Sequence, residues 1–337
     1  MKETIKQLTE AYGPSGYETQ VRELLQQMIH DEGLARGKGD DIRVDALGNL
    51  IVLKKGSGGG KKVMLAGHMD EIGVVVTHVD KEGFLRFSNV GGVRPHTLLG
   101  GRVRFADGAV GIIGLEKMED PARLPGLDKF YIDVGAADKA SCPVRVGDLA
   151  GFSRPFEELG QRLVAKAMDD RIGCAVILQV LRELETSPHD VYYVFTVQEE
   201  VGLRGATTSG YGIAPDLALA VDITLTGDTP EAATMAVSLG DGPAIKVKDG
   251  GMLAHPGVKN WLIETAEANG IPYQLEVLTG GTTDARAIQL TRAGVPAGCV
   301  SIPCRYAHTP SEVVDYGDVT GAVGLLVAAL SKPIELA

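Results

Sequence analysis

The strongest constraint on the fold is the regular alternation of helix-like and strand-like segments in the second half of the sequence. Between residues 171 and 330, stretches with helical spacing of apolar residues are separated by short runs rich in β-branched residues. This alternation is typical of a mostly parallel sheet with helices on both faces, so the sequence predicts an α/β fold. The expected helices are 171–185, 204–211, 258–268, 285–292 and 319–330, and the expected strands are 191–197, 217–221, 273–277 and 297–302.

Residues 72–163 have a different texture. They contain short β-like runs separated by glycines, and no long helical pattern. Turn signals at this spacing are typical of a small β-barrel or sandwich. We therefore expect an inserted, small β-barrel-like domain at residues 72–163 and an α/β domain built from residues 1–71 and 164–337. The β-like runs are 73–79, 84–87, 103–105, 110–115, 130–134 and 149–152.

Composition narrows the range of partners and locations. The net charge of -11 argues against nucleic acid or an anionic membrane as a partner. The first residues have no signal-peptide core, and no apolar run approaches the ~20 residues that span a bilayer. The four cysteines form no C-x-x-C pair in a chain too large to need disulfides. We expect reduced thiols in a cytoplasmic protein.

Acidic and imidazole side chains follow the predicted strands. The apolar run 191–197 leads directly to Glu199 and Glu200, whose side chains would point to opposite sides of an extended chain. One of them can therefore hold a metal while the other handles a proton. Open α/β sheets place their sites at the carboxyl ends of strands. The other candidates at such ends are His68, Asp70, Asp169, Asp170, Asp222 and His308.

These residue types suit Zn²⁺ or a similar metal ion, and there are enough of them for a two-metal site. Any one of the motifs alone is more often a capped loop or a solvated surface than a metal site. Their joint order along the chain, H-x-D, D-D, E-E, D and H, favours a dinuclear site.

This ordered set resembles the co-catalytic metallopeptidases, and most of all the M42 glutamyl aminopeptidase group, which includes the large tetrahedral aminopeptidases. The insert between Asp70 and Asp169 also matches M42, because M20 peptidases carry their lid later and M28 peptidases have no comparable insert. M18 chains share the position but are generally longer. The matching stretches are LAGHMDEIG, AKAMDDRIG, TVQEEVGLRGA, AVDIT, GGTTDARAI and PCRYAHTPSE, between residues 65 and 312.

The resemblance implies two divalent metal ions per subunit, Zn²⁺ or Co²⁺. The implied ligands are Asp169 as the bridge, His68 and Asp222 for the first ion, and Glu200 and His308 for the second. Glu199 resembles the general base, and Asp70 would accept the ring N–H of His68 and fix its tautomer. Asp170 resembles the neighbour of the bridge, where these enzymes often have a cis peptide.

The stretch GGTTDARAI resembles the substrate-side loop of the family. Main-chain N–H groups at its helix start can bind a carbonyl or carboxylate, or the stretch can be a simple capped glycine turn. Arg286 stands where the family often has glycine, and it can favour acidic side chains or form a salt bridge. The candidate substrate-binding residues are Gly281, Thr282, Asp284 and Arg286.

The leading hypothesis is an aminopeptidase that removes N-terminal residues from short peptides with a free N-terminus. A metal-dependent deacylase of small amides is the first alternative. A glycoside hydrolase is the second, although adjacent Glu199 and Glu200 do not offer two carboxylates on opposite sides of one bond. The resemblance further implies a homo-oligomer, commonly a dodecamer, in which the inserted domain makes many of the contacts.

Overall fold

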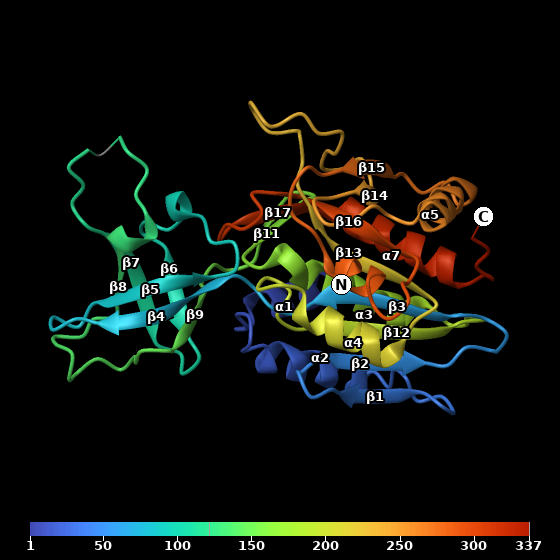
Figure 1. The fold of residues 1–337 in the computed structure, drawn as a ribbon, viewed down its shortest axis with the longest axis horizontal. Coiled ribbons are helices and arrows are strands. Elements are labelled where there is room, and N and C mark those ends of the chain that lie inside the picture. The colour runs from blue at the N-terminus through green and yellow to red at the C-terminus, as the bar shows by residue number, and fades with distance from the viewer. Residues whose placement is uncertain (121, 337) are drawn as a thin grey trace.

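The computed structural model describes residues 1–120 and 122–336 of the chain. An α/β body carries the two chain ends that Figure 1 marks, and a smaller β-barrel projects from one side of it. The barrel is inserted into the α/β body between β3 (Lys62–His68) and β10 (Glu157–Leu159), which pairs with β11 (Arg162–Ala165). The predicted fold class, an α/β fold with an inserted barrel, is confirmed.

One large mixed sheet forms the centre of the α/β body. Its parallel strands β12, β3, β13 and β16 lie side by side, and antiparallel strands flank them on both edges. The sheet order is β1 (Asp41–Val44), β2 (Leu50–Lys54), β12 (Asp190–Thr196), β3, β13 (Leu217–Thr224), β16 (Ala297–Arg305), β17 (Glu312–Asp315), β11 and β10 (Glu157–Leu159). Strands β14 (Ala244–Lys248) and β15 (Gln274–Val277) pair with each other, and β14 also pairs with β16. The sequence did not predict β10, β14 or β17.

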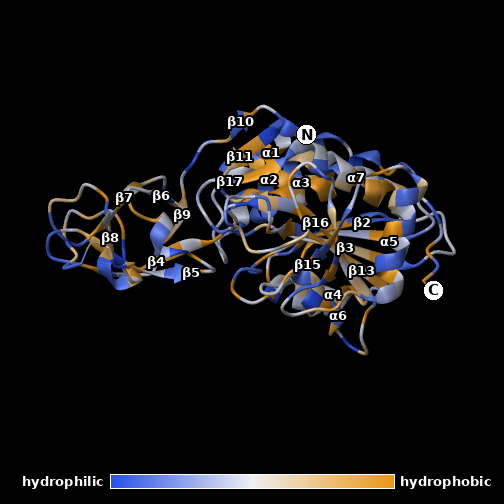
Figure 2. Ribbon diagram, turned by 90° about the horizontal axis from the view of Figure 1, so that it is seen from above, coloured by the Kyte–Doolittle hydropathy of each residue, from blue (hydrophilic) through white to orange (hydrophobic). Residues whose placement is uncertain are grey.

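Helices cover both faces of this sheet, as predicted. In β3, Val63 and Leu65 face one layer of apolar residues, whereas Met64 and Ala66 face the other. This follows from the period of two in a strand that is buried on both sides. The first layer is built with α1 (Lys2–Glu10), α2 (Thr19–Asp31), α3 (Met168–Glu183), α5 (Pro256–Ala268) and α7 (Tyr316–Leu330), and the second with α4 (Arg204–Ile213) and α6 (Asp284–Gln289). Figure 2 shows hydrophobic residues where these helices meet the strands.

The inserted barrel has a core of its own. Its strands close in the order β4 (Gly73–Val79), β5 (Leu85–Val90), β8 (Phe130–Asp133), β7 (Val110–Leu115), β6 (Arg102–Phe105) and β9 (Leu149–Phe152). Val74, Leu85, Val103 and Ile132 are buried inside it. Two short 3₁₀ helices, Pro95–Thr97 and Leu127–Lys129, lie in its loops. Within the described residues, no helix has both the length and the apolar character needed to cross a membrane.

Candidate metal centre

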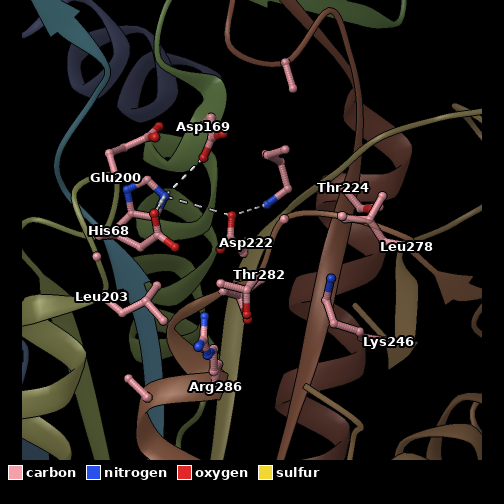
Figure 3. Close-up of a pocket in the computed structure, with 18 of the residues that line it drawn as sticks. His68, Asp169, Glu200, Leu203, Asp222, Thr224, Lys246, Leu278, Thr282 and Arg286 are labelled. Carbon is pink, nitrogen blue, oxygen red and sulfur yellow. Dashed lines mark hydrogen bonds and ion pairs between the residues drawn. The ribbon is translucent and has the colours of Figure 1, made fainter. Parts of the chain in front are cut away.

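The carboxyl ends of the parallel strands bring most of the predicted site residues together. His68 ends β3, Glu199 and Glu200 follow β12, Asp222 lies in β13, and His308 follows β16. Figure 3 shows the side chains of His68, Glu200 and Asp222 close to that of Asp169, which lies at the start of α3. Two sets of three donors result, and within each set the donor atoms lie within 4.8 Å of one another. The sets are His68, Glu199 and Asp222, and Asp169, Glu200 and His308.

Asp169 lies between the two histidines. Its Oδ1 is 3.1 Å from Nε2 of His68, and its Oδ2 is 3.2 Å from Nε2 of His308. Each oxygen of one carboxylate thus faces a different imidazole. The Asp169–Asp170 peptide bond is cis, as the resemblance implied.

Glu200 and Asp222 each lie close to the histidine of their own donor set. Nε2 of His308 lies 3.5 Å from Oε1 of Glu200, and Nε2 of His68 lies 4.0 Å from Oδ1 of Asp222. The Oε1 atom of Glu200 is buried and has no hydrogen-bond partner among the described residues. Such an atom is unfavourable unless a cation or donor satisfies it.

Burial and repulsion between carboxylates shift the pKa values of the acidic groups in this centre. Burial, followed by the charge of Asp169, raises the pKa of Glu200 to about 8. Burial also raises the pKa of Asp222 to about 7, and Asp169 adds to this shift. Burial acts in the same direction on Asp169, but hydrogen bonds with both histidines hold its pKa below the usual range. Divalent cations would relieve the repulsion, and imidazole nitrogens with carboxylate oxygens are the donors that Zn²⁺-like ions accept.

Asp70 supports the centre in a way that the sequence only partly indicates. Nδ1 of His68 lies 3.1 Å from the main-chain carbonyl oxygen of Asp70 and 3.4 Å from its carboxylate, so the closer acceptor is the carbonyl. The carboxylate of Asp70 instead accepts the main-chain N–H groups of Glu199 at 2.9 Å and Glu200 at 3.1 Å. Asp70 therefore fixes the turn that carries both glutamates.

Glu312 is a residue of the centre that the sequence reasoning missed. Its buried carboxylate accepts the main-chain N–H of Asp169 at 3.0 Å and that of His308 at 2.7 Å. Burial and the charge of Asp169 raise its pKa to about 8. The only signal in the sequence was its place at the end of the stretch PCRYAHTPSE, four residues after His308.

A cavity of about 930 Å³ opens above the centre and extends to α6. The candidate substrate residues Gly281, Thr282 and Arg286 line it, and Figure 3 shows Thr282 and Arg286 on the side of the cavity beyond Asp222. Asp284 does not line it: this side chain is buried and accepts the hydroxyl hydrogen of Thr196. The structure therefore does not bring Asp284 to the surface where a substrate would bind.

The comparison with known proteins agrees with this geometry. The family described as M42 glutamyl aminopeptidase matches residues 48–325. The chain belongs to the M42 family. As an M42 protein it is a metal-dependent peptide hydrolase that acts on N-termini, and this membership favours neither the deacylase nor the glycoside hydrolase.

Proteins with similar sequences or structures match this chain over nearly its whole length. A relative from Acetivibrio thermocellus, whose own aminopeptidase activity is a proposal, is 48% identical over 333 residues, which are 98% of each chain. The aminopeptidase APDkam598 from the archaeon Desulfurococcus kamchatkensis is 45% identical with a TM-score of 0.92, and the match covers 98% of this chain and 94% of that one. The TET1 peptidase of Pyrococcus horikoshii, which can assemble into a tetrahedron or a large octahedral shell, is 32% identical with a TM-score of 0.85 over 98% and 99% of the two chains.

Proposed function

We propose that the protein removes N-terminal residues from short peptides with a free N-terminus, using two divalent ions, Zn²⁺ or Co²⁺. The observation that carries the two-ion site is the Asp169 carboxylate, whose oxygens lie 3.1 Å and 3.2 Å from Nε2 of His68 and of His308. When bound, such ions would polarise the scissile carbonyl and lower the pKa of a shared water. The proposed ligands are Asp169 as the bridge, His68 and Asp222 on one side, and Glu200 and His308 on the other.

Glu199 is the proposed general base. Its Oε2 lies 3.9 Å from Nε2 of His68, and its side chain lines the cavity. Burial raises its pKa well above the ordinary value, and the charge of Asp222 adds to this shift. A carboxylate with a raised pKa can take a proton from water and later give it to the leaving amine. Distance alone also groups Glu199 with His68 and Asp222, but Asp169 already offers a donor to that side.

Replacement of the base separates catalysis from metal binding. Glu199→Gln should keep both ions and lower kcat by about 10²- to 10⁴-fold, because the amide cannot accept the proton. His308→Ala should lose one ion. The measurements are kcat on a short peptide and metal content per chain, with the exposed Glu185→Gln as the matched control. Full activity in Glu199→Gln would refute the base, and loss of an ion would make Glu199 a ligand instead.

Arg286 supports a preference for acidic N-terminal residues. Its side chain is exposed to the cavity, and among the described residues its guanidinium has no hydrogen bond or ion pair. Lys246, the other cation on this side of the cavity, is buried and already paired with Glu276. Arg94, from the inserted barrel, is a second exposed cation that lines the cavity, and Arg286 is the one that lies beside the candidate substrate residue Thr282.

The preference can be tested by charge reversal. Arg286→Glu should invert the ranking of glutamyl over lysyl peptides, whereas the neutral Arg286→Gln should only flatten it. An unchanged ranking in both variants would mean that Arg286 does not contact the substrate side chain. The same assay with acetylated peptides tests the deacylase alternative, because an aminopeptidase requires the free amino group.

The proposal also covers the number of subunits and the location of the protein in the cell. A dodecamer in which the predicted inserted domain, residues 72–163, makes many of the contacts is supported by the similarity to a TET1 peptidase that forms a tetrahedron or an octahedral shell. Light scattering after size exclusion gives the subunit number, and a monomer at micromolar concentration would overturn it. A cytoplasmic location is in keeping with four free cysteines, three of them buried, and cell fractionation tests it.

A further inference from the structure

A segment of the inserted barrel reaches the metal centre of the α/β body. Residues 91–94, here called the barrel loop, directly follow β5. Val93 is anchored in the barrel core, whereas the carbonyl oxygen of Gly92 lies 3.2 Å from Nδ1 of His308. These two partners are 216 residues apart in the sequence. The barrel therefore touches one of the proposed metal ligands directly.

The chemistry of this contact fixes the imidazole of His308. A carbonyl oxygen can only accept, so Nδ1 must carry the hydrogen. In the neutral ring Nε2 then keeps its lone pair, and this atom faces Asp169 at 3.2 Å and Glu200 at 3.5 Å. A lone pair on Nε2 is what a metal ion requires of the ring.

His68 shows the same arrangement with a local partner. Its Nδ1 faces the carbonyl oxygen of Asp70, two residues along the chain, and its Nε2 faces Asp169. The side chain of His68 is 2% exposed, whereas that of His308 is 31% exposed. Packing therefore restrains His308 less than His68, and the contact with the barrel loop matters more for its orientation.

Gly91 and Gly92 of the barrel loop lie so close to the metal centre that neither position has room for a Cβ atom. A Cβ atom at Gly92 would overlap Nδ1 of His308 and lie 2.6 Å from its Cε1. At Gly91, which has φ of +75°, a Cβ atom would lie 3.1 Å from Oε2 of Glu200 and 2.9 Å from Cγ2 of Ile72. The loop is thus in contact with two ligands of the same proposed ion.

We propose that the barrel loop is a positioning element for the ion held by Glu200 and His308. The Gly92 carbonyl sets the tautomer and orientation of His308, and Gly91 limits the space available to Glu200. Gly92 acts through His308 and is a positioning residue. This inference rests on the two-ion site proposed above, and it gives the inserted domain a part in the metal centre that does not depend on assembly.

The test measures metal binding in the full-length chain, stripped with chelator and titrated with Zn²⁺ or Co²⁺. Gly92→Ala should weaken one of two binding events by about 10- to 100-fold and leave the other unchanged. Gly91→Ala should act in the same direction. Gly100→Ala is its matched control, because Gly100 lies in the same barrel with φ of +75° and a Cβ atom there meets nothing within 4 Å.

A double-mutant cycle separates positioning from general damage. If Gly92 acts through His308, Gly92→Ala should add no loss of metal affinity in the His308→Ala background. Additive losses, equal weakening of both binding events, or full affinity in Gly92→Ala would each overturn the inference. A wild-type chain that binds one ion, or a His308→Ala chain that still binds two, would instead contradict the proposed two-ion site.

Discussion

At the scale of residues, buried carboxylates hold the main chain of the metal centre. Asp70 accepts the N–H groups of Glu199 and Glu200, and Glu312 accepts those of Asp169 and His308. Both oxygens of each carboxyl accept an N–H group, which suits the ionised form, and hydrogen bonds to an ionised carboxylate are stronger than neutral ones. The proposed ligands are therefore positioned through their backbones, before any contact of their side chains.

The role of Glu312 can be tested by substitution. In Glu312→Gln the amide keeps one acceptor oxygen, but its NH₂ group faces the N–H of either Asp169 or His308. One buried N–H then lacks an acceptor, which costs about 1–3 kcal/mol, and metal affinity should fall by about 10- to 100-fold. Metal titration and denaturation measure the two effects. Behaviour equal to that of Glu185→Gln would show that these hydrogen bonds do not support the centre.

The sequence indicated the ligand side chains but not their supports. His68, Asp169 and Asp222 each follow or end a short apolar run, so local patterns point to them. Three of the four partners of Asp70 and Glu312 lie 129 to 143 residues away, and the fourth, His308, is four residues from Glu312. All four are main-chain N–H groups, which carry no residue signature. The contact between Gly92 and His308 was invisible for the same reason.

At the scale of elements, Gly205 allows α4 to pack closely against the end of β12. A Cβ atom there would overlap Oδ1 of Asn49 and lie 2.5 Å from the main-chain N and O of Val197. Gly205→Ala should therefore destabilise the protein by about 1–3 kcal/mol. Gly212→Ala, in the same helix with no neighbour within 4 Å, should be stabilising by up to about 1 kcal/mol. Urea denaturation of both variants tests the pair, and equal effects would mean that the close approach is not limiting.

The connection between β13 and β14 is attached to β16 by an ion pair. Nε of Arg305 donates to Oδ1 of Asp228 at 2.9 Å, and Nη2 donates to Oδ2 at 2.7 Å. The Arg305 guanidinium holds the pKa of Asp228 well below its usual range. A carboxyl whose pKa is depressed by folding contributes stability above its unfolded pKa of about 3.9, and this contribution is lost as the pH falls.

This ion pair should make the stability of the protein depend on pH. Asp228→Asn should lower the free energy of unfolding by about 1 kcal/mol at pH 7, and the difference from wild type should shrink as the pH falls below about 4. Urea denaturation at several pH values measures it. Arg305→Gln should cost the same amount, and the double variant should cost no more than either single one. A difference that is constant with pH would exclude the ion pair as its cause.

The elements were predictable where a local pattern decides them. The helix expected at 204–211 spans Arg204–Ile213, and the strand expected at 297–302 spans Ala297–Arg305. Strand β14 was missed because its sequence AIKVK contains two lysines and reads as an exposed segment. Lys246 is nevertheless buried, since Glu276 of β15, thirty residues later, supplies its counter-charge.

At the scale of the whole molecule, the barrel is inserted at the metal centre itself. The chain leaves the α/β body just after His68 and Asp70 and returns with the hairpin of β10 and β11, which ends just before Asp169. At this junction the buried Lys166 pairs with Glu71 at 2.7 Å, and Arg171 donates to the carbonyl oxygen of Met69. The segments that join the two bodies therefore also carry the proposed ligands.

Metal removal should consequently destabilise the α/β body as a whole. Without cations the buried carboxylates of Asp169, Glu200 and Asp222 repel one another, and ions that bind only the folded chain stabilise it by about 2.7 kcal/mol per site at a hundredfold excess over Kd.

The only tryptophan of the sequence, Trp261, is buried in α5, so its fluorescence reports unfolding of this body and not of the barrel. Chelator should lower the urea midpoint of the fluorescence transition, and Zn²⁺ or Co²⁺ should restore it. His308→Ala should recover only part of the shift, because one ion remains. An unchanged midpoint in protein proven free of metal would mean that the ions do not bind at these buried carboxylates.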